Sequence, residues 1–229
     1  MRAAAILLAA GRGERLGGDR PKALLEVGGL TLLDRAIRTV EAAPEIEGFL
    51  VVAPPGHHEE MEAAAADSTR FLAVVAGGAS RQDSVRRALE ALPPGFDVVV
   101  CHDVARPFAS PRLFSAVLGA LVRADGAVPV VPVADTVKRM SKGRVVETVP
   151  RDDLVLAQTP QAFLRGVLER AHEEAEADGV TATDDAALLE RAGGHVAVVP
   201  GEPDNMKVTA PEDLERAEAV ARSLDGGGS

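Results

Sequence analysis

Residues 3–16 read AAAILLAAGRGERL, an apolar run that passes directly into a glycine-rich loop. The apolar part has the length and composition of a buried strand. Gly11 and Gly13 free the backbone behind it, so that its N–H groups can close around phosphate oxygens. Arg15 and Lys22 add two cations where a triphosphate would lie. This stretch therefore predicts the start of an α/β fold with an anion-binding loop.

The loop departs from two common nucleotide-binding signatures. A dinucleotide fold favours Gly or Ala at the third glycine position, where this chain has Leu16, and no acidic residue follows the end of the second expected strand. A P-loop requires Gly-Lys-Ser or Gly-Lys-Thr, which the chain lacks. Taken alone, the loop leaves open an ordinary surface turn with solvated charges.

Apolar runs of this kind recur and alternate with segments of helical periodicity. Because the runs are apolar throughout, they predict a mainly parallel sheet with helices on both faces. Ligands bind such sheets beyond the carboxyl ends of the strands. The expected strands are Ala3–Leu8, Phe49–Ala53, Phe71–Val75, Val98–Cys101, Val128–Val133 and Val196–Val199, and Leu32–Val40 and Val85–Leu92 are expected helices.

Two segments depart from this alternation. Between Asp135 and Arg151, short polar runs flank Ser141-Lys142-Gly143, which predicts a protruding β-hairpin arm with little apolar surface. A final helix is expected from Thr209, whose cap Glu212 could complete, to about Leu224.

Length and hydropathy limit the kind of protein. With 229 residues and 46% hydrophobic content, we expect one domain over residues 1–225, with the arm at about 135–151 and a disordered tail at 226–229. No stretch approaches about 18 consecutive apolar residues, and the first apolar run leads into Gly-Arg-Gly instead of a cleavage site. We therefore expect a soluble, cytoplasmic protein without a membrane contact.

The net charge of −10 argues against nucleic acid as a partner, because such binding needs a row of Lys and Arg. An anionic small molecule would need a local cluster of cations with a metal ion. Trp and Tyr are absent, so recognition must rest on backbone groups and charges. We expect Cys101 to be buried in a strand and His102 to be structural. The remaining histidines are expected at the surface: His57, His58, His172 and His195.

Polar side chains follow three further strands where a buried sheet does not explain them. In the segment after the third strand, Ser80 is the expected helix cap, while Ser84 could face a base or ribose. Asp103 follows the fourth strand, and Asp204 and Lys207 follow the last. Acids and cations at successive sheet ends favour a phosphate and magnesium site over chance surface charge.

Taken together, these motifs resemble the methylerythritol phosphate cytidylyltransferase family. The resemblance implies a Rossmann-like three-layer sandwich, a homodimer joined by the arm, Mg²⁺ as cofactor, and transfer of CMP from CTP to 2-C-methyl-D-erythritol 4-phosphate in non-mevalonate isoprenoid synthesis. The motifs run in order from residue 9 to residue 209: Ala-Ala-Gly-x-Gly-x-Arg with Pro21-Lys22, Asp83-Ser84-Val85, His102-Asp103-x-Ala105-Arg106-Pro107, Asp135-Thr136-Val137-Lys138, Thr159-Pro160-Gln161, Thr183-Asp184 and Asp204-Asn205-x-Lys207-Val208-Thr209.

The resemblance also implies roles for single residues. The residues expected to contact CTP are Ala9, Ala10, Gly11 and Gly13, with Gly77, Asp83 and Ser84 at the cytosine and ribose and Asp103 near a magnesium ion held mostly by the phosphates. Those expected to bind the acceptor are Asp103, Ala105, Arg106, Thr136, Arg151, Thr159, Thr183 and Lys207, with Thr136 and Arg151 reaching the other subunit's site. The expected catalytic residues are Arg15, Lys22, Arg151 and Lys207.

The chain departs from the family pattern at two positions, where Ala79 replaces a frequent acidic residue and Pro150 replaces a frequent Asp before Arg151. Neither change removes a side chain that is expected to act in the reaction. Two alternatives stay open: a cytidylyltransferase for another polyol phosphate such as ribitol 5-phosphate, and a non-catalytic nucleotide-binding module.

Overall fold

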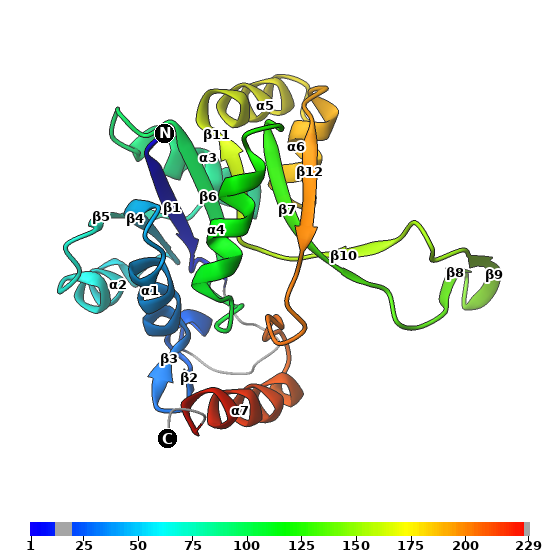
Figure 1. Cartoon of the computed structure of the whole chain (residues 1–229), viewed down its shortest axis with the longest axis horizontal. Helices are drawn as coiled ribbons and strands as arrows, with labels where there is room; N and C mark the ends of the chain where they lie inside the picture. Colours follow the sequence, from blue (N-terminus) through cyan, green and yellow to red (C-terminus); the bar gives the residue numbers. More distant parts are fainter. Residues whose placement is uncertain (12–19, 227–229) are drawn as a thin grey trace.

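A computed structural model describes residues 1–11 and 20–226 of the chain (Figure 1). The strands are β1 Ala3–Leu8, β2 Glu26–Val27, β3 Leu30–Thr31, β4 Ile46–Ala53, β5 Phe71–Ala76, β6 Val98–Asp103, β7 Gly126–Pro132, β8 Val137–Ser141, β9 Arg144–Val149, β10 Val155–Ala157, β11 Gln161–Leu164 and β12 Val196–Pro200. The helices are α1 Leu32–Ala42, α2 His58–Ala65, α3 Arg81–Ala91, α4 Pro111–Ala120, α5 Arg165–Ala177, α6 Asp185–Arg191 and α7 Pro211–Gly226, with a 3-10 turn η2 at Lys22–Leu24.

The main sheet is mixed but mostly parallel. Its strand order is β10-β7-β11-β6-β1-β4-β5, and β12 pairs with β7. Pairs β1–β4, β1–β6, β4–β5 and β7–β12 are parallel, whereas β10 and β11 run antiparallel to β7. The expected α/β class with a mainly parallel sheet is confirmed, and the antiparallel strands follow the arm because the chain there turns back along β7.

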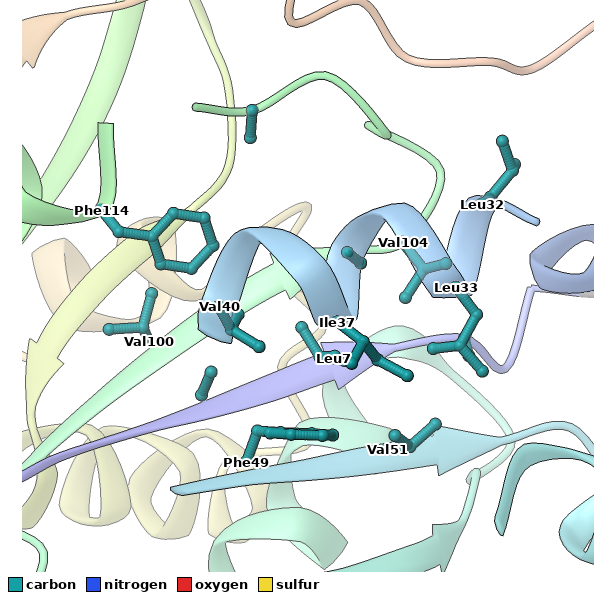
Figure 2. Packing of buried hydrophobic residues seen from close by; sticks show 14 of the residues in the cluster. Leu7, Leu32, Leu33, Ile37, Val40, Phe49, Val51, Val100, Val104 and Phe114 are labelled. Carbon is teal, nitrogen blue, oxygen red and sulfur yellow. The ribbon is translucent and has the colours of Figure 1, made fainter. Parts of the chain in front are cut away.

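The core lies on both faces of the sheet, which explains why β1 is apolar at every position. Ala3, Ala5 and Leu7 pack with α1 and α4, while Ala4 and Ile6 pack with α3, α5 and α6 on the opposite face. Figure 2 shows the first cluster, in which Leu7 lies among side chains of α1, β4 and β6. Alternate side chains of a strand point to opposite faces, so each face receives apolar groups.

The expected strands are all present, most of them longer than expected. Complete burial on both faces holds for the central strands but not at the margins. In β12, Val198 is 67% exposed because the strand pairs only with β7 and lies at the end of the sheet. Cys101 is buried in β6, as expected.

The arm is a β-hairpin, as expected. β8 and β9 pair antiparallel around Lys142 and Gly143, which both have positive φ (48° and 76°) and so form the tight reversal. Figure 1 shows the hairpin standing away from the main sheet. Its apolar side chains lie mostly in solvent: Met140 and Val145 are 70% and 65% exposed.

The final helix starts differently from the expectation. α7 begins at Pro211, and its cap is not the expected Thr209–Glu212 pair. The Asp213 carboxylate instead accepts from the Thr209 hydroxyl and from the backbone N–H groups of Thr209 and Ala210, since it stands at the third helical position. α7 continues to Gly226, beyond the expected end at about Leu224, and residues 227–229 lie outside the described residues.

Within the described part of the chain, no helix combines the length and the apolar character that crossing a membrane would require.

Candidate functional site

A cavity of about 620 Å³ opens at the carboxyl ends of the parallel strands, where a ligand was expected from the sheet type. Its wall combines the ends of β1 and β6 with the loops that follow β4, β5 and β12. The described residues that line it are Leu8, Ala9, Ala10, Gly11, Lys22, Ala23, Pro55, Gly78, Ala79, Ser80, Arg81, Ser84, Asp103, Val104, Ala105, Lys207 and Thr209.

Glycines bring the loop after β5 against the end of β1. A Cβ atom on Gly77 would lie 2.6 Å from Ala10 Cβ and 3.0 Å from the Ala53 carbonyl oxygen, and one on Gly78 would overlap the Asp83 carboxylate. The Gly77 N–H donates to the same Ala53 oxygen at 2.8 Å. Only glycine fits this approach, so the cavity wall here is made of bare backbone.

The first turn of α3 fixes the shape of that loop. Ser80 Oγ accepts from the Asp83 N–H at 3.0 Å, which confirms Ser80 as the helix cap. The Asp83 carboxylate accepts from the Ala79 N–H at 3.0 Å and pairs with Arg86 at 2.7 Å. Partial burial works against ionisation, but these bonds outweigh it and lower the pKa of Asp83.

Asp103, the last residue of β6, lies between two cations. Its Oδ1 accepts from Arg81 Nε at 3.2 Å and its Oδ2 from Lys207 Nζ at 2.6 Å. Burial opposes the charged carboxylate, yet Arg81 and then Lys207 more than offset it and hold the pKa of Asp103 well below its usual value. Asp103 is therefore ionised at neutral pH.

A second carboxylate lies behind this pair. Arg81 Nη1 donates to Asp185 Oδ2 at 2.8 Å, and Asp185 is completely buried at the start of α6. Burial disfavours both charges, but Asp185 and Asp103 raise the pKa of Arg81, and Arg81 lowers that of Asp185. Lys207, Asp103, Arg81 and Asp185 thus form a continuous row of alternating charges, which we call the charge row.

His102 supports Asp103 from inside the sheet. It is fully buried, and its Nδ1 lies 3.1 Å from Thr159 Oγ1, which also accepts from the Asp103 N–H at 3.0 Å. Burial lowers the pKa of His102 to about 4, so its ring is neutral at pH 7. Its position agrees with the expected structural role.

A buried polar network holds the backbone of the loop that carries Lys207. The Gln158 side chain donates to the Glu202 carbonyl at 2.8 Å and accepts from the Glu202 N–H at 3.1 Å. Asn205 Nδ2 donates to the Thr159 carbonyl at 2.9 Å, and Arg106 Nη1 donates to the Asn205 carbonyl at 2.8 Å. The loop before Lys207 is therefore anchored on the segment between β10 and β11 and on the loop that follows β6, although the Lys207 side chain is 42% exposed.

The donor set fits one kind of metal site. Within residues 1–11 and 20–226, no cluster of three or more His, Cys, Asp or Glu could hold a metal ion. Asp103 is the acidic side chain of the described lining, and after its two N–H contacts its oxygens keep lone pairs. Magnesium commonly binds one or two carboxylates together with substrate phosphates and water. The residues therefore fit a magnesium ion held largely by a nucleotide.

A family model described as 2-C-methyl-D-erythritol 4-phosphate cytidylyltransferase matches residues 3–223, nearly the entire chain. The chain belongs to this cytidylyltransferase family. The predicted enzyme class, a nucleotidyltransferase, is confirmed with it. The resemblance to this family, which the motifs indicated, is also confirmed.

Relatives and a solved structure agree with the assignment. A Saccharopolyspora erythraea protein named 2-C-methyl-D-erythritol 4-phosphate cytidylyltransferase is 45% identical, and the match covers 96% of this chain and 99% of that protein. A Clavibacter michiganensis "bifunctional enzyme IspD/IspF" is 47% identical over 98% of this chain, which spans only 55% of that protein. A crystal structure of the 4-diphosphocytidyl-2C-methyl-D-erythritol synthase from Anaerococcus prevotii has a TM-score of 0.86 at 31% identity and covers 96% of both chains.

The cytidylyltransferase fold gathers many of the residues predicted from sequence around one cavity, and their chemical roles remain predictions. Those in the lining are Ala9, Ala10, Gly11, Lys22, Ser84, Asp103, Ala105 and Lys207. Those directly behind it, bonded to loops of the wall, are Gly77, Asp83, Arg106 and Thr159. Gly13 and Arg15 lie outside the described residues.

Besides Arg106 and Thr159, three more predicted acceptor-binding residues lie outside the described lining. Thr136 and Arg151 stand at the two ends of the arm and are exposed, and the Arg151 guanidinium bonds to the Ala134 carbonyl. Thr183 is also exposed, in the segment just before α6. Within one chain, these side chains therefore do not contribute to the cavity wall.

Sequence reasoning missed the inner half of the charge row and misplaced one histidine. Arg81 and Asp185 are separated by 104 residues, and no local pattern connects them. His172 was expected at the surface but is 2% exposed, with its Nε2 3.5 Å from Asp185 Oδ1. A helical period could have placed it correctly, because Leu168 and Ala175 share its buried face of α5.

Proposed function

We propose that this chain transfers CMP from CTP to 2-C-methyl-D-erythritol 4-phosphate and releases pyrophosphate. The observation that carries the proposal is the cavity, whose wall combines bare backbone, the cations Lys22, Arg81 and Lys207, and one ionised carboxylate that Arg81 and Lys207 contact. Cations and backbone N–H groups are the groups that stabilise phosphates during transfer. Membership of the family supports this acceptor over ribitol 5-phosphate and over a silent binding module.

The chemistry needs no general base. A phosphate monoester is anionic at neutral pH, so one of its oxygens can form the new bond to the α-phosphorus of CTP while the bond from that phosphorus to the bridging oxygen breaks. The electron pair leaves with pyrophosphate, and no proton has to move. His102, neutral and outside the described lining, is consistent with this route. Catalysis then consists of in-line positioning and stabilisation of charge on the phosphates.

Each side of the cavity would hold one part of the reactants. The backbone at Ala9, Ala10 and Gly11 would cradle the triphosphate, with Lys22 offsetting charge as it develops on the transferred and leaving groups. Arg15 is proposed for the same task from sequence alone. The loop from Gly77 to Ser84 would read the cytosine and ribose. Lys207, in the loop after β12, would contact both substrates.

Magnesium is the proposed cofactor, and Asp103 is the residue that would hold it together with the nucleotide phosphates. When bound, the ion would neutralise phosphate charge and orient the triphosphate. The protein's own part is to present the Asp103 carboxylate in its ionised form at the cavity wall, which Arg81 and Lys207 ensure.

The arm is proposed to join two chains into a homodimer and to deliver Thr136 and Arg151 to the partner's cavity. Both side chains are exposed, and the arm presents apolar groups to solvent that a second chain could cover. The cytoplasmic location expected from sequence stays a prediction.

A pyrophosphate-release assay tests the proposed function. CTP and Mg²⁺ are supplied with 2-C-methyl-D-erythritol 4-phosphate, with ribitol 5-phosphate, or with no acceptor, and UTP replaces CTP as a donor control. We expect pyrophosphate release only when CTP is combined with 2-C-methyl-D-erythritol 4-phosphate. A preference for ribitol 5-phosphate would replace the acceptor, and tight CTP binding without release from any acceptor would favour the silent module.

A further inference from the structure

The charge row extends beyond the groups that the reaction requires. Asp103 and Lys207 reach the cavity, whereas Asp185 is completely buried behind Arg81 and lies outside the described lining. Three element ends meet at Arg81: it is the first residue of α3, Asp103 is the last of β6, and Asp185 is the first of α6. Asp185, the innermost group of the row, therefore has no role in the reaction as derived so far.

Arg81 occupies a position that opposes its charge. The N-terminus of a helix carries a partial positive charge, which disfavours a cation at the first helical position. Burial of the guanidinium adds to the cost. Its two counter-charges, Asp103 at 3.2 Å and Asp185 at 2.8 Å, offset these costs. An apolar residue would fill such a position with less penalty, so the placement indicates a task for the guanidinium.

The geometry of the guanidinium shows what Asp185 controls. The five N–H groups form a rigid planar fork, so a bond that fixes Nη1 also fixes the direction of Nε. With Nη1 bound to Asp185, Arg81 touches Asp103 through Nε alone, and its Nη2 is buried without a hydrogen-bond partner among the described residues. If Asp185 lost its charge, the guanidinium could turn two N–H groups onto the Asp103 carboxylate in the bidentate pairing that Arg favours.

We propose that Asp185 is a positioning residue for nucleotide transfer, which holds Arg81 to a single contact with Asp103 and so keeps that carboxylate available to the magnesium-bound triphosphate. The inference rests on the proposed function and adds to it a residue that never touches substrate. Asp185 acts only through Arg81.

The test compares Asp185→Asn with the parent by calorimetric binding of CTP, once in Mg²⁺ and once in EDTA. Asn keeps the shape and an acceptor oxygen but removes the charge. Residues that orient a metal ligand typically change metal affinity or activity by about 10–100-fold when altered. We expect Asp185→Asn to reduce the Mg²⁺-dependent gain in CTP affinity by a factor within that range, while the affinity for CTP in EDTA stays unchanged. Raising Mg²⁺ should then restore part of the lost pyrophosphate release.

Two further variants keep the test decisive. Arg81→Lys retains a cation but lacks the fork that bridges two carboxylates, so it should lose the same Mg²⁺-dependent gain even if Asp185→Asn does not fold. Asp34→Asn is the matched control, because Asp34 is also a carboxylate in the first turn of a helix, bonded to the Thr31 N–H, but lies outside the described lining. It should leave the Mg²⁺-dependent gain at the parent value.

Affinity that falls equally in Mg²⁺ and EDTA would assign Asp185 a merely structural role and overturn the inference. An unchanged Mg²⁺-dependent gain in the folded variants would do the same. Failure of the proposed function looks different, because the parent itself would then release no pyrophosphate with 2-C-methyl-D-erythritol 4-phosphate, whereas its binding of CTP would still report on Asp185.

Discussion

The cavity edge and the arm belong to the same chain but are built in opposite ways. At the cavity edge, charged side chains such as Asp103 and Asp185 are buried and each has a partner of opposite charge. On the arm, apolar side chains such as Val145 and Val146 are 65% and 58% exposed, and β8 and β9 pair chiefly with each other. The contrast fits the proposal that the chain preorganises the nucleotide side of its site by itself, whereas a partner chain completes the acceptor side.

The largest expected difference between the two regions is in stability. Phe49, a residue of β4, is fully buried in the cluster that contains α1 side chains. Phe49→Ala should lower the free energy of unfolding by about 3–5 kcal/mol through the lost contacts and the cavity left behind. Val146→Ala on the arm should change it by less than about 0.5 kcal/mol. Urea denaturation at one fixed protein concentration measures both. Similar shifts of the two midpoints would mean that the arm is as well packed as the core.

The next effect concerns activity at the cavity edge. Lys22 lines the cavity, and Lys22→Ala should reduce kcat by about 10²–10³ while CTP binding changes far less, because charge at the transferring phosphate develops mainly in the transition state. Arg139→Ala removes a cation from the arm, where Arg139 pairs with Glu147, and serves as the control. Steady-state kinetics of both variants check the expectation. If Lys22→Ala keeps nearly the parent kcat, Lys22 is a bystander.

The smallest expected signal tests whether the arm serves the partner's cavity. Lys22→Ala and Arg151→Ala chains should each be impaired as homodimers, yet a mixed dimer would hold one site with both defects and one with neither. In an equal mixture that exchanges at random, half of the dimers are mixed, so roughly a quarter of all sites should be intact in an isologous dimer. Co-refolding followed by a pyrophosphate assay detects them. Mixed dimers without recovered activity would confine Arg151 to its own chain.

Local sequence patterns predict much of the fold, and the predictions that were wrong also have local causes. The apolar run of β1 and the glycines behind it indicate a strand that is buried on both faces, and the structure confirms this. Ser80 is recognisable as a cap because a capping bond spans only three residues. At the start of α7, the sequence predicts Thr209 as the cap with Glu212 completing it, whereas Asp213 makes the bonds, since either acid is within reach of the turn and only the backbone path decides between them.

The site was less accessible to sequence reasoning because its key contacts are long-range. Asp103 and Lys207 drew attention as charges at strand ends, but their 2.6 Å contact joins residues 104 positions apart. Arg81 stands in a segment whose pattern predicts a helix cap and a glycine turn, and Asp185 directly follows the Thr183-Asp184 motif, so no local pattern distinguishes either residue. The hydrogen bond between Gln158 and Asn205 could not be predicted from the sequence either, because no local pattern indicates that these two amides are buried.

The position of the charge row along the chain has a consequence for synthesis on the ribosome. Asp103 and Arg81 belong to β6 and α3, whereas Asp185 is translated only after β11 and Lys207 only after β12. A nascent chain can pair β1, β4, β5 and β6 long before both of these partners exist. A chain that ends before Lys207 therefore lacks the part of the wall that this residue supplies. Only a polypeptide completed through β12 and the loop behind it can assemble the cavity proposed to bind CTP.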